Sequence, residues 1–470
     1  MGKSLQPLSG LDAAFLYLES AGTPMHVGSV MLLEVPPRQQ PGFHAKLSAH
    51  LRERMPRAPA LRRQLHAAPL GLGHPLWSEL PDIDLRQHLR RRRLPGAGGR
   101  TRLETLVAQL HAEVLPRDRP MWQFVLIENV EPGVVALYSK VHHALLDGQG
   151  GVALARALLD LEPAKPVRRA AAASKRAPAP AASRTRSRDL ARTASAATVR
   201  QFANLLRALP ATVKAAGATP GGSLLSALRS SVLRAPSSVF NRKVGPRRSF
   251  ATLSLPLEDV KRVARGFGAS LNDVVLAICA GALRKLLLQE GELPRLPLVA
   301  AMPVSLRVSG DQSVDNQVSM VQCTLATDVA DPVERLRAIQ ASTAQIKQRV
   351  TAFKGLIPTD YPGLAAPVWA AGLSRLWGSG NLAERLPALA NVAISNVPGP
   401  PVTLFLAGAP LRHYYPVSIV THGLAFNITV QSYAGHLEFG LTACKDVIAR
   451  PAVVADAMKS ALAELIERLP

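Results

Sequence analysis

The chain has 470 residues, 47% of them hydrophobic, which is enough for two globular domains with sizeable cores. Its 56 Lys and Arg outnumber its 33 Asp and Glu, and the net charge of +23 indicates either a solvated basic surface or a negatively charged partner. An aromatic content of 4% and the lack of a known nucleic-acid-binding motif argue against DNA or RNA, and favour an anionic phospholipid surface.

The N-terminal residues carry neither a signal peptide nor a myristoylation signal. No apolar run along the chain approaches the roughly 20 residues that span a bilayer. The chain has 3 cysteines, which fits a reducing compartment. We therefore expect a cytoplasmic protein without a transmembrane segment.

The most informative stretch in the first half is an apolar run at residues 134–141, which predicts a buried strand. It leads into His142–Gly148, with the sequence HHALLDG, and a helical pattern follows at 152–161. Gly148 allows a sharp turn. Two imidazoles and a carboxylate are thus expected where a strand leaves a sheet, and an imidazole with a pKa of about 6.5 suits proton transfer.

This histidine loop is typical of general-base chemistry rather than of a metal or nucleophile site. Adjacent histidines on a strand point to opposite faces, and the chain has no H-E-x-x-H or C-x-x-C pair. It also has no G-x-S-x-G elbow, no phosphate loop and no dinucleotide fingerprint. A histidine base without a protein nucleophile suits direct attack by a substrate hydroxyl or amine on an activated acyl group. Asp147 could orient a ring or brace the loop against an arginine.

A low-complexity segment rich in Ala, Pro, Ser and Arg begins at Lys165, and we expect part of it to be disordered. Helical patterns follow near 199–209 and 224–233. The predicted organisation is an N-terminal domain at 1–164, a basic linker with helical segments at 165–245 and a C-terminal domain at 246–470.

The second half mixes strands and helices. Ser270 and Asp273 form an S-x-x-D pattern that is typical of a helix N-cap. Both halves therefore predict an α/β or mixed α+β fold. The predicted elements are a strand at 251–255, a helix at 257–265 ended by Gly266, a helix at 274–288, a hairpin of 425–433 and 436–441, and a last helix at 451–467.

Further motifs accompany the histidine loop in a fixed order. They are Leu11–Phe15 (LDAAF), Pro24–Gly28 (PMHVG), Arg119–Trp122 (RPMW), Ser270–Val274 (SLNDV), Pro303–Arg307 (PVSLR) and Ser395–Pro400 (SNVPGP). With them, the chain resembles the bacterial wax ester synthase/diacylglycerol acyltransferase family, within the CoA-dependent acyltransferase superfamily. One departure is Met121, which replaces the Leu of the family's R-P-L-W element.

The resemblance implies two chloramphenicol-acetyltransferase-like domains with a tunnel between them and the histidine loop at its centre. It implies an acyl-CoA-dependent O-acyltransferase that makes triacylglycerol, wax esters or both from diacylglycerol and long-chain fatty alcohols. Acyl-CoA would be a substrate, and neither a cofactor nor a metal is expected. The enzyme would associate peripherally with the inner membrane or with lipid inclusions.

The resemblance also implies roles for individual residues. His143 would be the general base, and His142 and Gly148 would support the loop. Asp147 would be a structural brace, with Arg307 as its candidate partner.

The remaining motifs have both a functional and a structural interpretation. Asn272 is expected near the site and Asp273 as a helix cap, while Trp122 would contact substrate or, more readily, anchor the core. His26 is expected in a core. A turn after a strand contains three candidate substrate contacts, which would otherwise serve as a rigid turn: Asn396, Pro398 and Gly399.

Three alternatives remain at the level of sequence. The same fold could use another alcohol or an amine as acceptor, or the chain could be an inactive, basic, membrane-associated protein. His142 and Asp147 also match the H-x-x-x-x-D signature of glycerolipid acyltransferases, but the F-P-E-G element of that family is missing.

Overall fold

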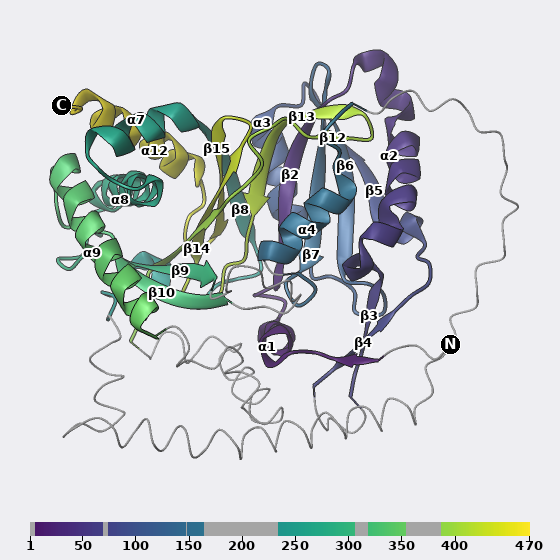
Figure 1. Ribbon diagram of the computed structural model, residues 1–470, viewed down its shortest axis with the longest axis horizontal. Coiled ribbons are helices and arrows are strands. Elements are labelled where there is room, and N and C mark those ends of the chain that lie inside the picture. Colours follow the sequence, from purple (N-terminus) through teal and green to yellow (C-terminus); the bar gives the residue numbers. More distant parts are fainter. Residues whose placement is uncertain (1–4, 69–73, 147, 164–233, 306–317, 354–386) are drawn as a thin grey trace, which may run out of the picture.

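A computed structural model of the chain describes residues 5–68, 74–146, 148–163, 234–305, 318–353 and 387–470. Two six-stranded sheets lie side by side, one in each half of the molecule, with helices packed on both (Figure 1). The mixed α/β fold predicted from the sequence is therefore confirmed. The basic segment from Lys165 and the expected helices at 199–209 and 224–233 lie outside the described residues.

The sheet of the N-terminal half is built around the strand that leads to the two histidines. In order across the sheet, its strands are β12 (Phe405–Leu406), β13 (Ala409–Val417), β2 (His26–Glu34), β7 (Val134–His142), β6 (Trp122–Glu131) and β5 (Leu89–Arg93). Strand β7 runs antiparallel to both β2 and β6. Both faces of β6 and β7 are buried along almost the whole length of the strands, as expected for strands rich in apolar residues.

The sheet of the C-terminal half holds the predicted hairpin. Its strands, in order, are β10 (Val318–Thr324), β9 (Val299–Ser305), β11 (Val392–Val397), β14 (Phe426–Tyr433), β15 (His436–Cys444) and β8 (Arg248–Pro256). The turn between β14 and β15 places Ala434 at φ 44° and Gly435 at φ 84°. Two positive φ values define the turn that matches the twist of a tight hairpin, and glycine adopts the second without strain.

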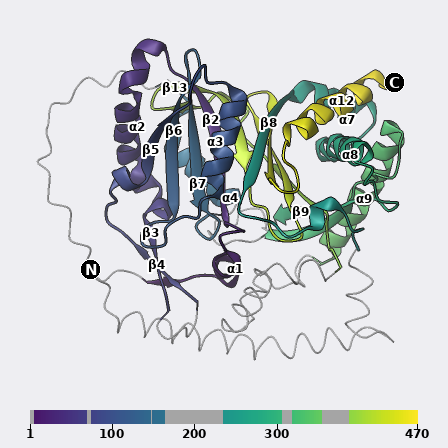
Figure 2. The ribbon, with the colours of Figure 1, turned by 180° about the vertical axis from the view of Figure 1, so that it is seen from behind.

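Helices complete the two cores, and a small sheet lies below the first half. Helices α2 and α4 cover one face of the N-terminal sheet, and α3 packs between its other face and β8 (Figures 1 and 2). Helices α7, α8, α9 and α12 gather on one face of the C-terminal sheet. The helix bounds are α1 (Gly10–Leu18), α2 (Gln40–Arg54), α3 (Arg100–Ala112), α4 (Gly148–Leu158), α7 (Leu257–Gly266), α8 (Leu271–Gln289), α9 (Pro332–Phe353) and α12 (Ala452–Glu467). The small sheet contains β1 (Gln6–Pro7), β4 (Leu76–Glu79) and β3 (Arg63–His66).

A segment of the C-terminal half joins the sheet of the N-terminal half. Strands β12 and β13 follow β11 of the C-terminal sheet in sequence, yet they pair in the N-terminal sheet, β13 against β2. The chain then returns to β14. A division of the sequence at residue 246 does not anticipate this arrangement, which ties the halves together.

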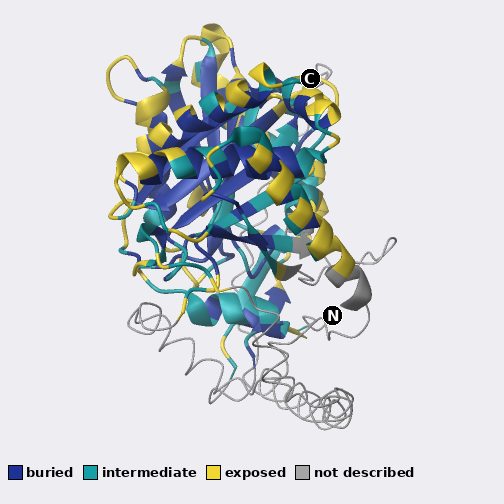
Figure 3. Ribbon diagram, turned by 90° about the vertical axis from the view of Figure 1, so that its left-hand side faces the viewer, coloured by how far each residue is buried: buried dark blue, intermediate teal, exposed yellow. Residues whose placement is uncertain are grey.

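The predicted elements agree with the structure except at their ends. The helix predicted at 257–265 continues through Gly266, with Phe267 as its C-cap, because the glycine with positive φ is Gly268, at 60°. The helix predicted at 152–161 is α4 and begins earlier, at Gly148. Figure 3 shows that the sheets and the inner faces of the helices are buried, whereas the outer faces of the helices are exposed.

Among the described helices, no single one is long and apolar enough to cross a bilayer. Helices α7 and α8 together meet the length and composition of a span, but they are bent by 102° at their junction. Helix α8 is apolar on most sides because it lies in the C-terminal core, where α7, α9 and α12 pack around it.

Candidate active site

The main chain fixes the histidine loop from both neighbouring strands. His142 ends β7 and lies opposite His26 of β2 in the antiparallel register. The His142 N–H donates to the carbonyl of Met121 (2.9 Å), and the His143 N–H donates to the carbonyl of Met25 (2.8 Å). Met121 immediately precedes β6, and Met25 immediately precedes β2. Both neighbours of β7 therefore position the loop.

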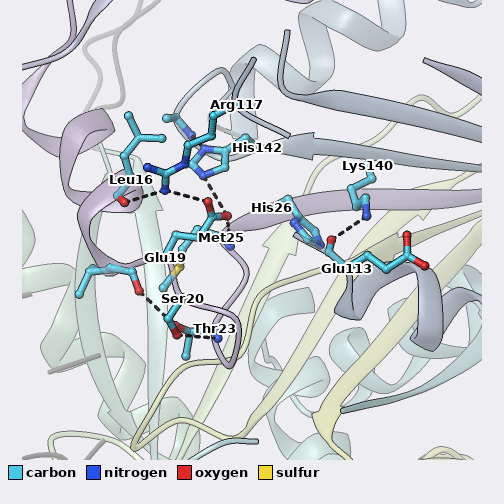
Figure 4. A network of polar contacts seen from close by, with 12 residues as sticks. Leu16, Glu19, Ser20, Thr23, Met25, His26, Glu113, Arg117, Lys140 and His142 are labelled. Atoms are coloured by element: carbon cyan, nitrogen blue, oxygen red, sulfur yellow. Dashed lines mark hydrogen bonds and ion pairs between the residues drawn. The ribbon is translucent and has the colours of Figure 1, made fainter. Parts of the chain in front are cut away.

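The ring of His142 is held in one tautomer. The N–H of Ala144 donates to Nδ1 of His142 (3.1 Å), so this nitrogen carries no proton and the neutral ring is protonated on Nε2. Nε2 lies 3.3 Å from Oε1 of Glu19, and both side chains are buried, with exposures of 0% and 2% (Figure 4). His142 thus faces a carboxylate inside the protein.

Glu19 is the centre of this polar network. Its Oε2 lies 2.9 Å from Nη2 of Arg117, and its Oε1 accepts a hydrogen bond from the Met25 N–H (3.2 Å). Arg117 also donates to the carbonyl of Leu16 in α1 (3.0 Å). Burial raises the pKa of Glu19, but the groups that contact the carboxylate outweigh this effect and lower the pKa to about 2. Glu19 is therefore ionised at neutral pH.

His143 lies against the first helix. Its ring stacks on the ring of Phe15 in α1, with 4.0 Å between the centroids and 15° between the planes. Within the described part of the chain, its Nδ1 is buried and has no hydrogen-bond partner. Burial lowers the pKa of His143 to about 4, and the polar main chain of the same residue opposes that shift only in part. A neutral imidazole is able to accept a proton.

A second polar cluster lies on the side of β7 and β2 that faces α3. Nζ of Lys140 donates to the carbonyls of Leu110 (2.7 Å) and Glu113 (2.8 Å) at the C-terminal end of α3. A cation is stabilised there by the helix dipole. Burial lowers the pKa of Lys140 to about 8, and the carboxylate of Glu113 opposes that shift. Lys140 therefore attaches α3 to the strand that carries the histidines.

His26 belongs to the same cluster. It is buried, and its Nε2 lies 2.7 Å from the carbonyl oxygen of His111. Burial holds the pKa of His26 well below 6.5, and the charges of His111 and Lys140 act in the same direction. His26 therefore lies in the core, as expected from the sequence.

Two of the predicted site residues, Asp147 and Arg307, lie outside the described residues. Their roles as brace and partner stay predictions. Gly148 is both the last residue of the loop and the first residue of α4.

Asn272 and Asp273, the N-D pair of the S-L-N-D-V motif, have different surroundings in the structure. Asp273 is the N3 residue of α8 and forms a capping box with Ser270, in which each side chain accepts the other's main-chain N–H. Its Oδ1 also accepts a hydrogen bond from Oγ1 of Thr343 (2.7 Å). Asp273 is thus the helix cap that the sequence pattern predicts. Asn272 is partly exposed on the first turn of α8.

Trp122 anchors the N-terminal core. Its side chain is buried, its Nε1 donates to the carbonyl of Leu61 (2.8 Å), and its ring stacks on His88 at 4.3 Å. This placement agrees with the packing interpretation rather than with a substrate contact.

The S-N-V-P-G-P segment lies where β11 ends. Asn396 and Pro398 are exposed. The N–H of Gly399 donates to Oγ of Ser432 (3.0 Å), and a Cβ at this position would lie 2.0 Å from the Ser432 carbonyl oxygen. The glycine is required by this close approach, which is the rigid-turn interpretation, while contact of these residues with substrate stays a prediction.

Sequence patterns missed Glu19, Arg117 and the contact of Phe15 with His143. The available signal for Glu19 was a single carboxylate between an apolar helix and an apolar strand. Nothing in the sequence around Arg117 distinguishes it from the many other arginines of this chain.

Among the described residues, no group of three or more His, Cys, Asp or Glu side chains is arranged to hold a metal ion.

Comparison with known proteins places the chain in a family. Residues 8–275 match the wax ester synthase/diacylglycerol acyltransferase catalytic domain, and residues 314–466 match the C-terminal domain of the same family. A putative diacylglycerol O-acyltransferase of Mycobacterium tuberculosis is 36% identical over 469 residues, which cover 97% of this chain and 99% of the relative.

Solved structures of similar proteins are consistent with this family assignment. The wax ester synthase/diacylglycerol acyltransferase from Marinobacter aquaeolei VT8 aligns with a TM-score of 0.69 and 31% identity, over 98% of both chains. The starter condensation domain of rhizomide synthetase, solved in complex with C8-CoA, aligns with a TM-score of 0.52 and 13% identity, over 99% of this chain and 94% of that one, and shows the fold alone. The chain therefore belongs to the wax ester synthase/diacylglycerol acyltransferase family and is an acyltransferase.

Proposed function

We propose that this enzyme transfers a long-chain acyl group from acyl-CoA to the hydroxyl of diacylglycerol or of a long-chain fatty alcohol, with His143 as general base. The products are triacylglycerol or a wax ester, together with free CoA. The observation that carries the proposal is the neutral imidazole of His143 on a loop fixed by both neighbouring strands and by a stacked ring.

The proposed reaction needs no covalent enzyme intermediate. The acceptor hydroxyl gives its proton to the His143 imidazole as its oxygen attacks the thioester carbonyl carbon. A carbon–oxygen bond forms, the carbon–sulfur bond breaks, and the imidazolium returns the proton to the departing thiolate. Because Nδ1 is buried, Nε2 is the nitrogen that we assign to this step. General-base assistance of this kind contributes about 10²–10⁴-fold to the rate.

His142 and Glu19 act as positioning residues in this proposal. The ionised carboxylate of Glu19 faces the Nε2–H of His142, and the main-chain N–H of Ala144 donates a hydrogen bond to Nδ1. Contacts at both ring nitrogens therefore hold the imidazole of His142 in place. A fixed His142 keeps the main chain of the loop in place, and the position of a base relative to its substrate decides much of its effect. Asp147, Gly148 and Arg307 are proposed to brace the same loop.

The proposed substrates are inferred from the names of similar proteins and from the ligand of one protein of the same fold. The similar proteins from Mycobacterium tuberculosis and Marinobacter aquaeolei are named for diacylglycerol and wax ester chemistry, and a protein of the same fold was solved with C8-CoA. The acceptors are lipids, so we propose that the enzyme works while peripherally attached to a membrane or a lipid inclusion. Acyl-CoA is a substrate, and the proposed steps use no cofactor.

The direct test supplies the purified full-length protein with palmitoyl-CoA and either dioleoylglycerol or hexadecanol, and follows ester and free CoA. We expect ester and CoA in equal amounts with at least one acceptor. Absence of ester with both acceptors would overturn the proposal. Ester or amide formed only with an unrelated alcohol or amine would reassign the acceptor.

A further inference from the structure

An arginine stripe lies on the outer edge of the N-terminal sheet. It consists of Arg90–Arg93, the last four residues of the edge strand β5 (Figure 1). Alternate side chains of a strand point to opposite faces, so a strand that covers a core buries every second residue. In β5, by contrast, Leu89 is buried and all four arginines are exposed.

The register with β6 assigns the arginines to the two faces. Arg90 and Arg92 pair with Val125 and Ile127, which belong to the core beside α3. Arg91 and Arg93 lie on the opposite face of the sheet, and α2 packs against the apolar core on that face. The stripe therefore presents guanidinium groups on both faces of one sheet edge.

Among the described residues, an acidic group neutralises only one of the four arginines of the stripe. Arg91 pairs with the nearly buried carboxylate of Glu128 at 2.8 Å. Within the part of the chain that the structure describes, Arg90, Arg92 and Arg93 have no ion pair. The surrounding sequence is also basic, since residues 37–102 contain, outside the stripe, 10 Lys and Arg but 4 Asp and Glu.

Charges on an edge strand can serve to prevent two sheets from pairing. Four adjacent like charges repel one another, and an opposing charge outside the protein relieves that repulsion. The arginine stripe can therefore protect the edge and also attract an anionic partner.

We propose that the arginine stripe is the surface by which the enzyme docks on anionic phospholipid. This inference rests on the proposed function, because diacylglycerol and fatty alcohols are dissolved in membranes. Arginine forms bidentate hydrogen bonds with phosphate, and a sheet edge with charges on both faces suits an extended array of headgroups. Each basic residue near such a surface strengthens binding about fivefold.

Lipid fits the arginine stripe better than nucleic acid. Proteins that bind single strands provide aromatic side chains on which bases stack, and β5 contains none. Duplex DNA is read by a helix or a ribbon that enters a groove, whereas the stripe belongs to the last strand of a six-stranded sheet. Headgroups demand only exposed, closely spaced cations.

The test compares two charge-reversal variants of the full-length protein that have the same net charge. The first is Arg92→Glu/Arg93→Glu, in the stripe. The control is Arg295→Glu/Arg450→Glu, at two exposed positions in the C-terminal half. Binding to phosphatidylcholine vesicles, with and without phosphatidylglycerol, is measured by sedimentation. We expect the stripe variant to partition at least tenfold more weakly onto phosphatidylglycerol vesicles, and the control to lose less than threefold.

Other outcomes overturn the assignment. Equal losses in both variants would mean that total charge, not the stripe, drives binding. No binding of the wild type to phosphatidylglycerol vesicles, or a loss seen with duplex DNA but not with vesicles, would also contradict it. If the Glu variant does not fold, Arg92→Gln/Arg93→Gln replaces it. Vesicle binding requires no turnover, so a failure of the proposed acyl transfer is detected separately, by the activity of the wild type in detergent micelles.

Discussion

At the scale of single residues, Glu19 determines more of the candidate site than its sequence surroundings indicate. Its buried carboxylate faces His142, Arg117 and the Met25 N–H, and these contacts join α1, the segment before β2, and the end of β7. The candidate base could be named from the sequence, because two adjacent histidines before Asp147 and Gly148 are a specific pattern, and its role stays a proposal. The positioning carboxylate was not, because it lies 123 positions before His142 in the chain and contacts it only after folding.

We expect Glu19→Gln to lower the free energy of unfolding by about 1.5–3 kcal/mol at pH 7, since hydrogen bonds to an ionised acceptor are lost. The pKa of Glu19 is about 2 in the folded protein against 4.5 ordinarily, so its charge stabilises the fold above pH 4.5, and that contribution is lost as the pH falls towards 2. The gap between wild type and variant in urea denaturation should therefore narrow below pH 4.5. Glu53→Gln, at an exposed position, is the matched control; an equal loss there would refute the role of Glu19.

The pH dependence of activity should report the lowered pKa of His143. A general base acts in its unprotonated form, and burial lowers its pKa from 6.5 to about 4. We expect kcat/KM to stay level between pH 6 and 8, and to fall on the acid side with a midpoint near 4. Circular dichroism at each pH separates this from unfolding, which acid also favours because the unfolded chain binds protons at buried histidines such as His111. A midpoint near 6.5 in folded enzyme would contradict the assignment.

At the scale of elements, the capping box of α8 shows how a local pattern specifies a helix start. Ser270 and Asp273 are three residues apart, so their mutual hydrogen bonds depend on local chain geometry alone and are readable from the sequence. The strand at 134–142 and the hairpin at 426–444 could also be predicted from local sequence, because apolar runs indicate the strands and a tight turn separates the two strands of the hairpin. Element ends were less predictable, as Gly266 and Gly268 show, because the φ of a glycine is decided by the fold around it.

We expect Asp273→Ala to lower the free energy of unfolding by about 1–2 kcal/mol, because the cap and the Thr343 hydrogen bond are both lost. Asn272→Ala, one residue away and partly exposed, should change it by less than about 0.5 kcal/mol. Thermal or urea denaturation of the two variants checks this. A larger loss for Asn272→Ala would reverse the structural roles of the two residues in the N-D motif.

At the scale of the whole molecule, the pairing of β12 and β13 in the N-terminal sheet joins the two halves. Strand β13 pairs with β2 of the N-terminal sheet and also packs against β15 of the C-terminal one. Sequence patterns could not predict this, because a strand that leaves its own half has the same apolar alternation as one that stays. The resemblance of the motifs supplied the two-domain fold, but pairing between distant strands is a property of the folded chain.

The close approach of β13 and β15 gives a sharp test. A Cβ added to Gly440 would lie 1.7 Å from the carbonyl oxygen of Pro416, which is main chain and cannot rotate away. We expect Gly440→Ala to destabilise the protein by about 3 kcal/mol or more in urea denaturation. Gly42→Ala, in α2 with no atom within 4 Å of the added Cβ, should be neutral or slightly stabilising. Equal stability of both variants would contradict the packing of β13 against β15.

The most direct test of the account is the turnover of His143→Ala with palmitoyl-CoA and the better of dioleoylglycerol and hexadecanol. We expect ester formation to fall by about 10²–10⁴-fold, with an unchanged melting temperature, because the variant lacks the group that accepts the hydroxyl proton. His44→Ala, on α2 away from the loop, should retain wild-type turnover. Activity of folded His143→Ala within tenfold of the wild type would contradict His143 as the base.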